Sequence, residues 1–476
     1  MNKPFYSRSC LFLLLVILLF IINRISYLNL PFYWDEAWSY ATAVFDMAGK
    51  GLAIIPGDGN DELTRGHPLL FYFLSALWVK IFGTSLTMVH LFPLMISVAL
   101  LIAVSIVAFE LFDKATAMAA TLLFGLQAVF LAQSTQLLPE VMLALWTLLT
   151  AYAYFTKKWV LFAVFSVLLV MTKETGMVLI FTLFLDKIVL EKFFINGQKR
   201  SGHLLIRELA FMSIPVIVFT GFMIIQKISV GYFLYPEHLN LAVLDPAEIF
   251  YRILCALKLS FQNGIIIFFI LSTAAFIYLI YNRSLINFPT HLLLFSGLFI
   301  IIYMLFSSIN FFTARYLLSL FPFIIILGTW IILKALQNVP YLKIITVFML
   351  MVLLSYYSFV GNQTEYDTSL GYKNTVLVQK QVVNYAEEMQ WQQQSIYSEF
   401  LMQYYLSIPD LGYLNDKKHP FVNISNNTLK AHDFYIFCSN ENDPFCDIIK
   451  NSPDIMLLKR FQNKKAWVEV YGKRPN

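Results

Sequence analysis

The chain has 476 residues, of which 59% are hydrophobic and only 13% are charged, and its formal net charge is +5. One water-soluble core cannot bury so many apolar residues, so the composition indicates an integral membrane protein rather than a set of soluble domains. The small net charge and the lack of a clustered basic stripe argue against a nucleic-acid partner.

About eleven apolar segments are predicted to span the membrane, because a helix needs about 20 mostly apolar residues to cross it. The predicted spans cover residues 10–28, 86–110, 116–134, 141–156, 159–172, 175–190, 208–226, 264–281, 291–309, 316–336 and 343–360. The first is expected to be a retained helix rather than a cleaved signal peptide, since no small-residue cleavage site follows it. The predicted fold class is therefore an α-helical polytopic membrane protein, in a domain of residues 1–360.

Lysine and arginine residues predict a cytoplasmic N-terminus. In that orientation the inner loops hold thirteen of them and the outer loops before the C-terminal region hold eight, spread over more residues. Positive residues favour the inner side of a membrane. Eleven crossings then place the C-terminal region outside, so we expect a multi-pass membrane protein with a cytoplasmic N-terminus and an exported C-terminal domain.

Two predicted outer loops are too long to be simple connectors. The loop of residues 30–85 contains an amphipathic stretch from Pro68 to Phe82, which we expect to form a juxtamembrane helix in the interface. The second long loop covers residues 227–263 and is rich in aromatic residues.

Residues 361–476 are polar and predict a small α/β soluble domain. A helix-like run covers residues 375–389, and β-like runs cover 434–437 and 466–471. Cys438 and Cys446 can form a disulfide if the region is exported, but spacing alone does not bring two sulfur atoms together.

The strongest local motif follows the first span, where Asp35 and Glu36 are framed by aromatic residues including Trp34. Carboxylates near a membrane interface are costly to desolvate and tend to be functional. An aspartate here can take the proton of an attacking hydroxyl, which contributes about 10²–10⁴-fold to a rate. The alternative is an ordinary helix start, where the helix dipole favours acids.

Four further motifs lie on the same predicted outer side: Arg65-Gly66-His67-Pro68 with Tyr72, Pro139-Glu140, Lys173-Glu174, and Arg315-Tyr316. Arginine and histidine at such positions can bind phosphate oxygens. Each motif also has an ordinary interpretation, as a helix-dipole acid, a surface ion pair or an interfacial cation. Their common side predicts a single site at the level of the lipid headgroups.

The order of these motifs resembles that of the GT-C superfamily of glycosyltransferases, in the branch of the protein O-mannosyltransferases and lipid A aminoarabinose transferases. The resemblance covers about residues 10–335. It implies a sugar donor linked to a polyprenyl phosphate, usually undecaprenyl phosphate, and transfer with inversion to a lipid, glycan or protein acceptor. The chain departs from the family where His67 replaces a common lysine and Pro68-Leu69-Leu70 replaces Pro-Pro-Leu.

The resemblance also implies roles for individual residues. Asp35 matches the proposed catalytic base, Glu36 its partner and Glu140 the second outer acid. The expected contacts of the donor phosphate are Arg65, His67, Lys173 and Arg315, and the expected site lining is Trp34, Tyr72, Glu174 and Tyr316. No metal ligand is assigned and no cofactor is expected, because the sequence has no metal-ligand spacing. A divalent cation remains an option.

Three other function classes fit a polytopic chain, and one of them is a sensor whose outer domain does the binding. An O-antigen ligase or polymerase has a similar helix count, but it favours a large outer loop late in the chain and does not call for an acid pair after the first helix. A non-enzymatic transporter of lipid-linked sugars is expected to show charges or Gly/Pro breaks at mid-membrane and paired repeats.

Overall fold

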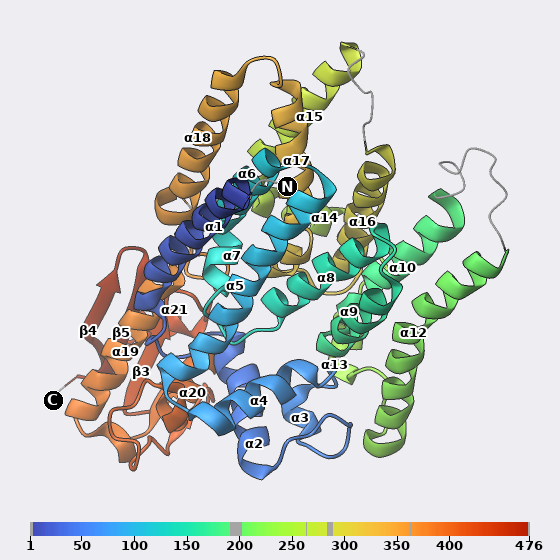
Figure 1. Ribbon diagram of the computed structural model, residues 1–476. Coiled ribbons are helices and arrows are strands. Elements are labelled where there is room, and N and C mark those ends of the chain that lie inside the picture. Colours follow the sequence, from blue (N-terminus) through green and yellow to red (C-terminus); the bar gives the residue numbers. More distant parts are fainter. Residues whose placement is uncertain (1–2, 191–201, 263, 283–288, 362, 475–476) are drawn as a thin grey trace.

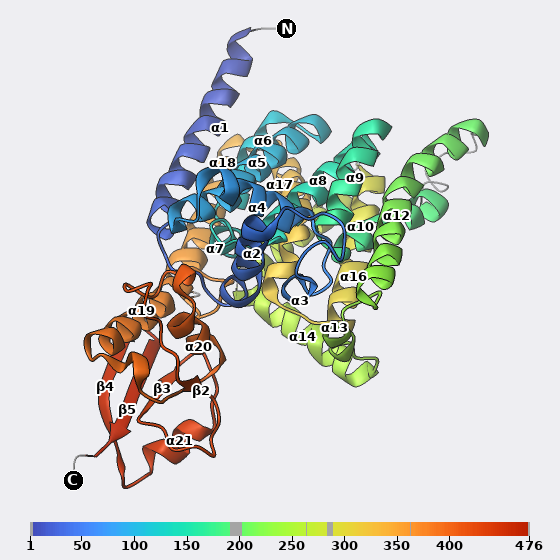
Figure 2. The same ribbon diagram turned by 90° about the horizontal axis from the view of Figure 1, so that it is seen from below.

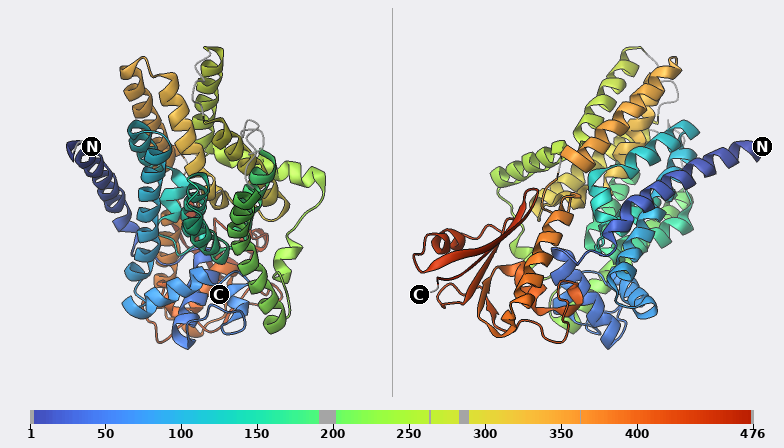
Figure 3. Two further views of the ribbon diagram at one scale, coloured as in Figure 1. Left: turned by 45° about the vertical axis from the view of Figure 1, so that its right-hand side comes forward. Right: turned by 90° about the vertical axis from the view of Figure 1, so that its left-hand side faces the viewer.

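The computed structural model describes residues 3–190, 202–262, 264–282, 289–361 and 363–474. Figure 1 shows a bundle of long helices with a small sheet of the C-terminal segment at its lower end. The two termini lie on opposite sides of the molecule (Figure 3). Predicted inner-loop residues within 191–201 and 283–288 lie outside the described residues.

The helices of the bundle follow the apolar segments of the chain. They are α1 (Lys3–Arg24), α5 (Leu86–Leu111), α6 (Lys114–Gly125), α7 (Ala128–Gln133), α8 (Glu140–Phe155), α9 (Trp159–Thr172), α10 (Met177–Leu185), α12 (Gly202–Val230), α14 (Pro246–Gln262), α15 (Ile265–Tyr281), α16 (Thr290–Ile309), α17 (Phe321–Ala335) and α18 (Pro340–Tyr356). Short 3-10 or π-helical turns continue several of them: η1 (Ile25–Tyr27), η3 (Glu174–Gly176), η4 (Asp186–Leu190), η5 (Ala314–Ser319) and η6 (Tyr357–Gly361).

Five helical segments among the described residues are long and apolar enough to cross a membrane. They are Ser9–Tyr27, Leu86–Leu111, His203–Val230, Thr290–Ile309 and Pro340–Gly361, with a sixth if α14 and α15, bent by 91°, count as one span. Four further apolar helices, α4 (Leu70–Phe82), α8, α9 and α17, have 10–17 residues. The chain is a multi-pass membrane protein, but the count of eleven spans is not confirmed.

The predicted spans of residues 116–134, 175–190 and 316–336 are broken. The first is divided into α6 and α7 at Leu126 and Gln127, and the side-chain oxygen of Gln127 accepts a hydrogen bond from the N–H of Phe130 (2.7 Å). The second begins as η3 and ends as η4, and the third begins as η5. Each break places a polar or charged side chain near the end of an apolar helix.

The long loop of residues 30–85 folds into short helices at one end of the bundle. These are η2 (Glu36–Ala41), α2 (Thr42–Lys50), α3 (Asp61–Thr64) and α4 (Leu70–Phe82), with α13 (Pro236–Asn240) from the second long loop. The helix predicted within residues 68–82 is confirmed as α4. Figure 2 shows α2, α3 and α4 at the same end as the C-terminal segment.

The C-terminal segment forms a five-stranded sheet in the order β2-β1-β3-β5-β4. Its strands are β1 (Ile396–Ser398), β2 (Ile424–Ser425), β3 (Phe434–Cys438), β4 (Ile455–Asn463) and β5 (Ala466–Lys473), and its main helices are α19 (Tyr372–Glu388), α20 (Phe400–Ser407) and α21 (Phe445–Lys450). β1 is parallel to β2 and β3, and β5 is antiparallel to β3 and β4. The small α/β fold that the sequence predicts is present.

Cys438 and Cys446 are not joined by a disulfide. Cys438 is buried in the core that also holds Ile436, whereas Cys446 packs against Tyr435 and Phe437. Successive residues of a strand point to opposite faces of the sheet, so the two thiols lie on different faces and cannot meet.

The C-terminal segment is packed directly against the loop of residues 30–85. One hydrophobic core contains Phe32, Tyr33 and Tyr72 together with Val376 and Tyr405. The backbone N–H of Phe32 also donates to the carbonyl of Leu411 (3.1 Å). This shared core fixes the position of the first loop, which carries the acid pair.

Candidate functional site

Five charged side chains form one network centred on Arg315. Its guanidinium contacts the carboxylates of Asp35 and Asp367, and its Nε lies 3.4 Å from Oε1 of Glu140. The same oxygen of Glu140 accepts a hydrogen bond from Nζ of Lys173 at 3.0 Å. Residues from five separate parts of the chain therefore meet, and three acids share two cations.

The backbone around Asp35 is shaped by its aromatic neighbours. Trp34 has a left-handed φ of 52°, and Asp35 is the N-cap residue of η2. Nε1 of Trp38, one helical turn later, donates to Oδ1 of Asp35 (2.9 Å). A non-glycine residue in this conformation costs of order 1–3 kcal/mol and is concentrated at functional sites, which supports a special role for the turn.

Helix ends present the other members of the network. Glu140 is the first residue of α8, directly after Pro139, and Lys173 is the C-cap residue of α9. Nζ of Lys173 lies 4.3 Å from the ring centroid of Tyr316, whose backbone carbonyl accepts from the Tyr303 hydroxyl (2.9 Å). The acid, the cation and the aromatic ring are thus each held by a defined element.

The side chain of Asp35 is more exposed to solvent than those of the other four residues of the network. Its side chain is 25% exposed, whereas those of Glu140, Lys173, Arg315 and Asp367 are 1%, 4%, 4% and 5% exposed. Burial favours the neutral acid, but the charge of Arg315 and the hydrogen bonds from Arg315 and Trp38 outweigh it, so the pKa of Asp35 lies below its ordinary value. Asp35 is therefore an ionised carboxylate that a substrate can reach.

Asp367 was not among the residues expected from the sequence. It lies in the strap, which we define as residues 363–371, between η6 and α19. Its backbone carbonyl accepts hydrogen bonds from the side-chain amides of Gln133 and Gln136, both at 2.9 Å. Burial raises the pKa of Asp367 to about 6, against the charge of Arg315 and with the help of nearby Asp35.

The raised pKa of Asp367 makes stability depend on pH. The folded chain holds this proton more tightly than the unfolded one, whose value is 3.8. The contribution of the Asp367 proton to the free energy of unfolding is fully present below pH 3.8 and is lost as the pH rises through about 6. Between pH 7 and pH 5 we expect wild type to gain about 1 kcal/mol of unfolding free energy over Asp367→Asn. Detergent unfolding curves at both pH values measure this, and an unchanged difference would contradict it.

A second cluster adjoins the network through the loop of residues 30–85. Nδ1 of His67 lies 2.9 Å from Oε2 of Glu174, and the His67 ring lies 4.9 Å from that of His238 in α13. Burial and then the charge of His67 lower the pKa of His238 to about 4. Burial opposes ionisation of Glu174, but His67 overcomes it and sets the pKa of Glu174 at about 2.

Aromatic side chains connect the second cluster to the first. The guanidinium of Arg65 lies 3.9 Å from the ring centroid of Trp38, the residue that donates to Asp35. The Tyr40 ring stacks on His67 (6.5 Å) and on Tyr72 (5.5 Å). Residues from all five sequence motifs therefore lie in one region, together with Asp367, His238, Trp38 and Tyr40, which were not expected.

Glu36 has a different environment from its neighbour Asp35. Its side chain is 2% exposed, and Oε1 accepts from the N–H of Leu137 and lies 3.1 Å from Nε2 of His90. Oε2 accepts from the N–H of Tyr33 (3.3 Å). This carboxylate ties the first loop to α5 and to the turn before α8, and its contacts are those of a positioning residue.

Removing the Glu36 carboxylate is expected to reduce stability. Glu36→Ala leaves the N–H of Leu137 and the ring of His90 buried without this acceptor, at a cost of about 1–3 kcal/mol. Thermal unfolding in detergent measures the loss. Glu62→Ala, on the exposed surface of α3, is the matched control and is expected to change little. Equal stability of the two variants would contradict a structural role for Glu36.

No group of three or more histidine, cysteine or acidic side chains is arranged to hold a metal ion within the part of the chain that the structure describes. The histidines near the site contact carboxylates instead, as His67 does with Glu174 and His90 with Glu36.

The fold is similar to two solved membrane proteins. ArnT from Cupriavidus metallidurans in the apo state aligns over 98% of each chain with a TM-score of 0.57 and 11% identity. The same protein bound to undecaprenyl phosphate aligns over 99% of this chain and 98% of that one, with a TM-score of 0.57 and 12% identity. The oligosaccharyltransferase AglB from Archaeoglobus fulgidus, in complex with an inhibitory peptide and a dolichol-phosphate, covers 89% of this chain and 61% of its own, with a TM-score of 0.51 and 13% identity.

No family model matches the sequence, and no curated protein matches it by sequence. The likeness is therefore one of fold. The fold that the order of the motifs implies is confirmed, because the chain shares it with ArnT and with the oligosaccharyltransferase AglB.

Proposed function

We propose that the chain is an inverting glycosyltransferase that moves a sugar from a polyprenyl-phosphate donor to a lipid, glycan or protein acceptor. The observation that carries the proposal is the accessible, ionised carboxylate of Asp35 inside a network of buried charges. The fold supports it, because ArnT and AglB were both solved with a polyprenyl-type phosphate bound. We place the site on the periplasmic side of a bacterial inner membrane.

Asp35 is the proposed base. As the acceptor hydroxyl attacks the anomeric carbon, its proton passes to the Asp35 carboxylate, and the bond between that carbon and the phosphate oxygen breaks. The polyprenyl phosphate leaves with the bonding electron pair. Because attack and departure occur on opposite faces of the sugar, the configuration inverts. Arg315 and Trp38 hold the base in one orientation throughout.

Arg65 and His67 are the proposed contacts of the leaving phosphate. Their side chains are 26% and 12% exposed, and each has one carboxylate partner, Glu237 at 3.6 Å for Arg65 and Glu174 at 2.9 Å for His67. Arg315 and Lys173 are only 4% exposed, and Arg315 faces three carboxylates while Lys173 is held by Glu140. A preorganised positive charge stabilises the negative charge that grows on the leaving oxygen. Arg315 and Lys173, which are buried and paired with carboxylates, add to the positive potential of the site.

The C-terminal segment supplies part of this site. We assign the transferase domain to residues 1–360 and a periplasmic α/β domain to residues 361–476, but Asp367 of the second contacts Arg315 of the first. The catalytic network therefore depends on both parts.

Mass spectrometry of membrane lipids and glycoconjugates from cells with and without the gene tests the function. We expect one sugar modification to disappear and the matching sugar-linked polyprenyl phosphate to accumulate. The modified molecule identifies the acceptor class. Unchanged glycoconjugates and unchanged donor lipid would refute the proposal, and loss of a donor lipid without any lost modification would favour a different reaction.

A further inference from the structure

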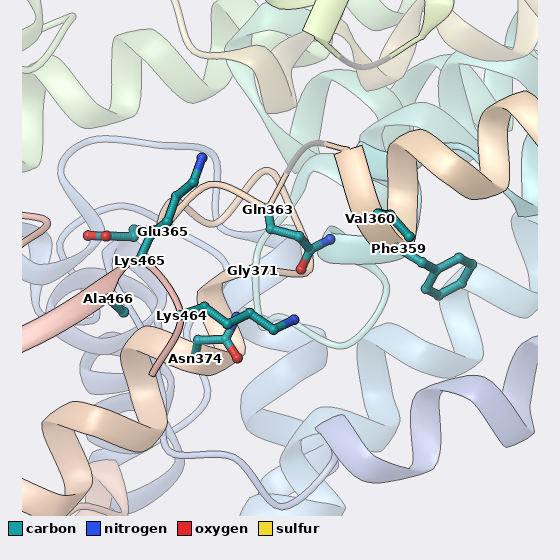
Figure 4. Close-up of a pocket in the computed structure, with 9 residues that line it drawn as sticks. All are labelled: Phe359, Val360, Gln363, Glu365, Gly371, Asn374, Lys464, Lys465 and Ala466. Atoms are coloured by element: carbon teal, nitrogen blue, oxygen red, sulfur yellow. The ribbon is translucent and has the colours of Figure 1, made fainter. Parts of the chain in front are cut away.

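A pocket of about 420 Å³ lies outside the charged network, where η6, the strap, the start of α19 and the β4–β5 turn meet (Figure 4). We call it the strap pocket. Its lining combines three kinds of side chain, apolar Phe359 and Val360, amide-bearing Gln363 and Asn374, and basic Lys464 and Lys465. An apolar side next to cations and amides fits an amphiphile with a negative head.

The two lysines occupy a turn that does not favour them. Asn463 pairs with Ala466 across the β4–β5 ladder, so Lys464 and Lys465 alone form the connection. Lys464 has a left-handed φ of 54°. Lys465 does not share this conformation, and a two-residue hairpin turn with a positive φ at its first central residue alone favours glycine there, so the lysine is a strained choice of the kind found at functional sites.

The positive charge of the turn is neutralised only in part by the protein. Both lysines are exposed, and neither forms an ion pair with any residue that the structure describes. Glu365 is the acid of the pocket, but its carboxylate accepts a hydrogen bond from Ser439 (2.7 Å). Figure 4 shows Glu365 pointing away from Lys464 and Gln363. Burial raises the pKa of Glu365 and the charge of Lys465 opposes this, so the carboxyl offsets at most one of the two lysine charges, and an anion entering the pocket still meets net positive charge.

An apolar stripe leads along α18 and the π-helical turn η6 to the pocket. Phe348, Val352 and Tyr356 follow one another on α18 at intervals of four residues, so they share a face, and Val360 follows in η6. All four are exposed. Pro340–Gly361 is one of the segments long enough to cross a membrane. A lipid chain lying on this stripe brings its headgroup to the level of the lysines.

We propose that the strap pocket binds the phosphate headgroup of an anionic membrane lipid. Lys464 and Lys465 contact the phosphate, the side-chain amides of Gln363 and Asn374 donate to its oxygens, and the lipid chain follows the stripe on α18. Because the pocket borders the strap that also carries Asp367, the bound lipid holds the strap in place. This binding does not depend on the transfer reaction.

A turn variant separates lipid binding from folding. Lys464→Gly with Lys465→Asn removes both charges and places glycine at the position whose φ is positive, so the melting temperature of the full-length variant in neutral detergent is expected to be at least that of wild type. Lys417→Gly with Lys418→Asn makes the same changes in another exposed lysine pair and is the control. Melting temperatures are measured with added phosphatidylglycerol, phosphatidylcholine or inorganic phosphate.

Phosphatidylglycerol is expected to raise the melting temperature of wild type and of the control pair by several degrees, and the turn variant is expected to lose at least half of this shift. Phosphatidylcholine is expected to raise the melting temperature by less than phosphatidylglycerol does, since its choline neutralises the charge of the phosphate. An equal shift in the turn variant overturns the site. A shift of the same size with inorganic phosphate overturns the assignment to a lipid.

Discussion

Replacing Asp35 by asparagine is expected to lower sugar transfer by about 10²–10⁴-fold, the usual range for a lost general base. Asparagine keeps the size of the side chain and an oxygen that can accept from Nε1 of Trp38, but it cannot take the acceptor proton. Mass spectrometry of the modified glycoconjugate, in cells that lack the gene and carry either version, measures the ratio.

Asp46→Asn is the matched control for this substitution. Asp46 lies in α2 of the same loop and pairs with exposed Lys50 at 2.7 Å, so the change alters charge near the site without touching the network. Transfer by this variant is expected to equal that of wild type. Transfer by Asp35→Asn above about one tenth of wild type would show that Asp35 is not the base.

Several helices could be predicted from hydropathy alone because their ends are marked by polar residues. The predicted span of residues 159–172 coincides with α9, which lies between Lys158 and Lys173. The predicted span of residues 86–110 ends one residue before α5 does, and Ser85 caps the start of α5 through its side-chain oxygen. Charges and caps mark the places where an apolar helix has to stop.

Breaks inside apolar segments could not be predicted in this way. The cap of α7 is Gln127, and glutamine is not among the residues that favour an N-cap. The average hydropathy of residues 116–134 therefore concealed the break. The same reasoning applies to η5, where Arg315 stands in a buried 3-10 turn rather than at the end of a regular helix.

The site was predictable as a set of motifs but not as a set of contacts. The prediction that Asp35, Glu140, Lys173 and Arg315 come together rested on their common side of the membrane, and the structure joins them. Asp367 follows the last apolar helical segment, which ends with η6, and it lies in a polar segment without a recognisable motif. Only the folding of the strap over Gln133 and Gln136 brings it to Arg315.

The acid pair shows a further limit of the sequence. Asp35 and Glu36 are adjacent and chemically alike, so a motif assigns both to catalysis. The π-helical turn that follows them directs one carboxylate to Arg315 and the other to His90 and Leu137. Which of two neighbouring acids is accessible depends on packing contacts more than fifty residues away in the chain.

Replacing Arg315 by methionine is expected to cost about 3–5 kcal/mol of stability, the usual effect of removing one partner from a buried ion pair. Methionine keeps an apolar stem of similar length but leaves Asp35, Glu140 and Asp367 facing one another without their shared cation. Unfolding of the purified chain by increasing SDS in mixed micelles, followed by circular dichroism, measures the loss.

Arg460→Met provides the comparison, because Arg460 pairs with Glu469 at 3.0 Å but its side chain is 45% exposed. An exposed pair contributes about 0–1 kcal/mol, so this variant is expected to stay close to wild type. Adding Asp367→Asn to Arg315→Met removes one of the three stranded charges and is expected to recover part of the lost stability. If both arginine variants lost the same small amount, the carboxylates around Arg315 would have to be neutral or hydrated, and the network could not hold Asp35 ionised.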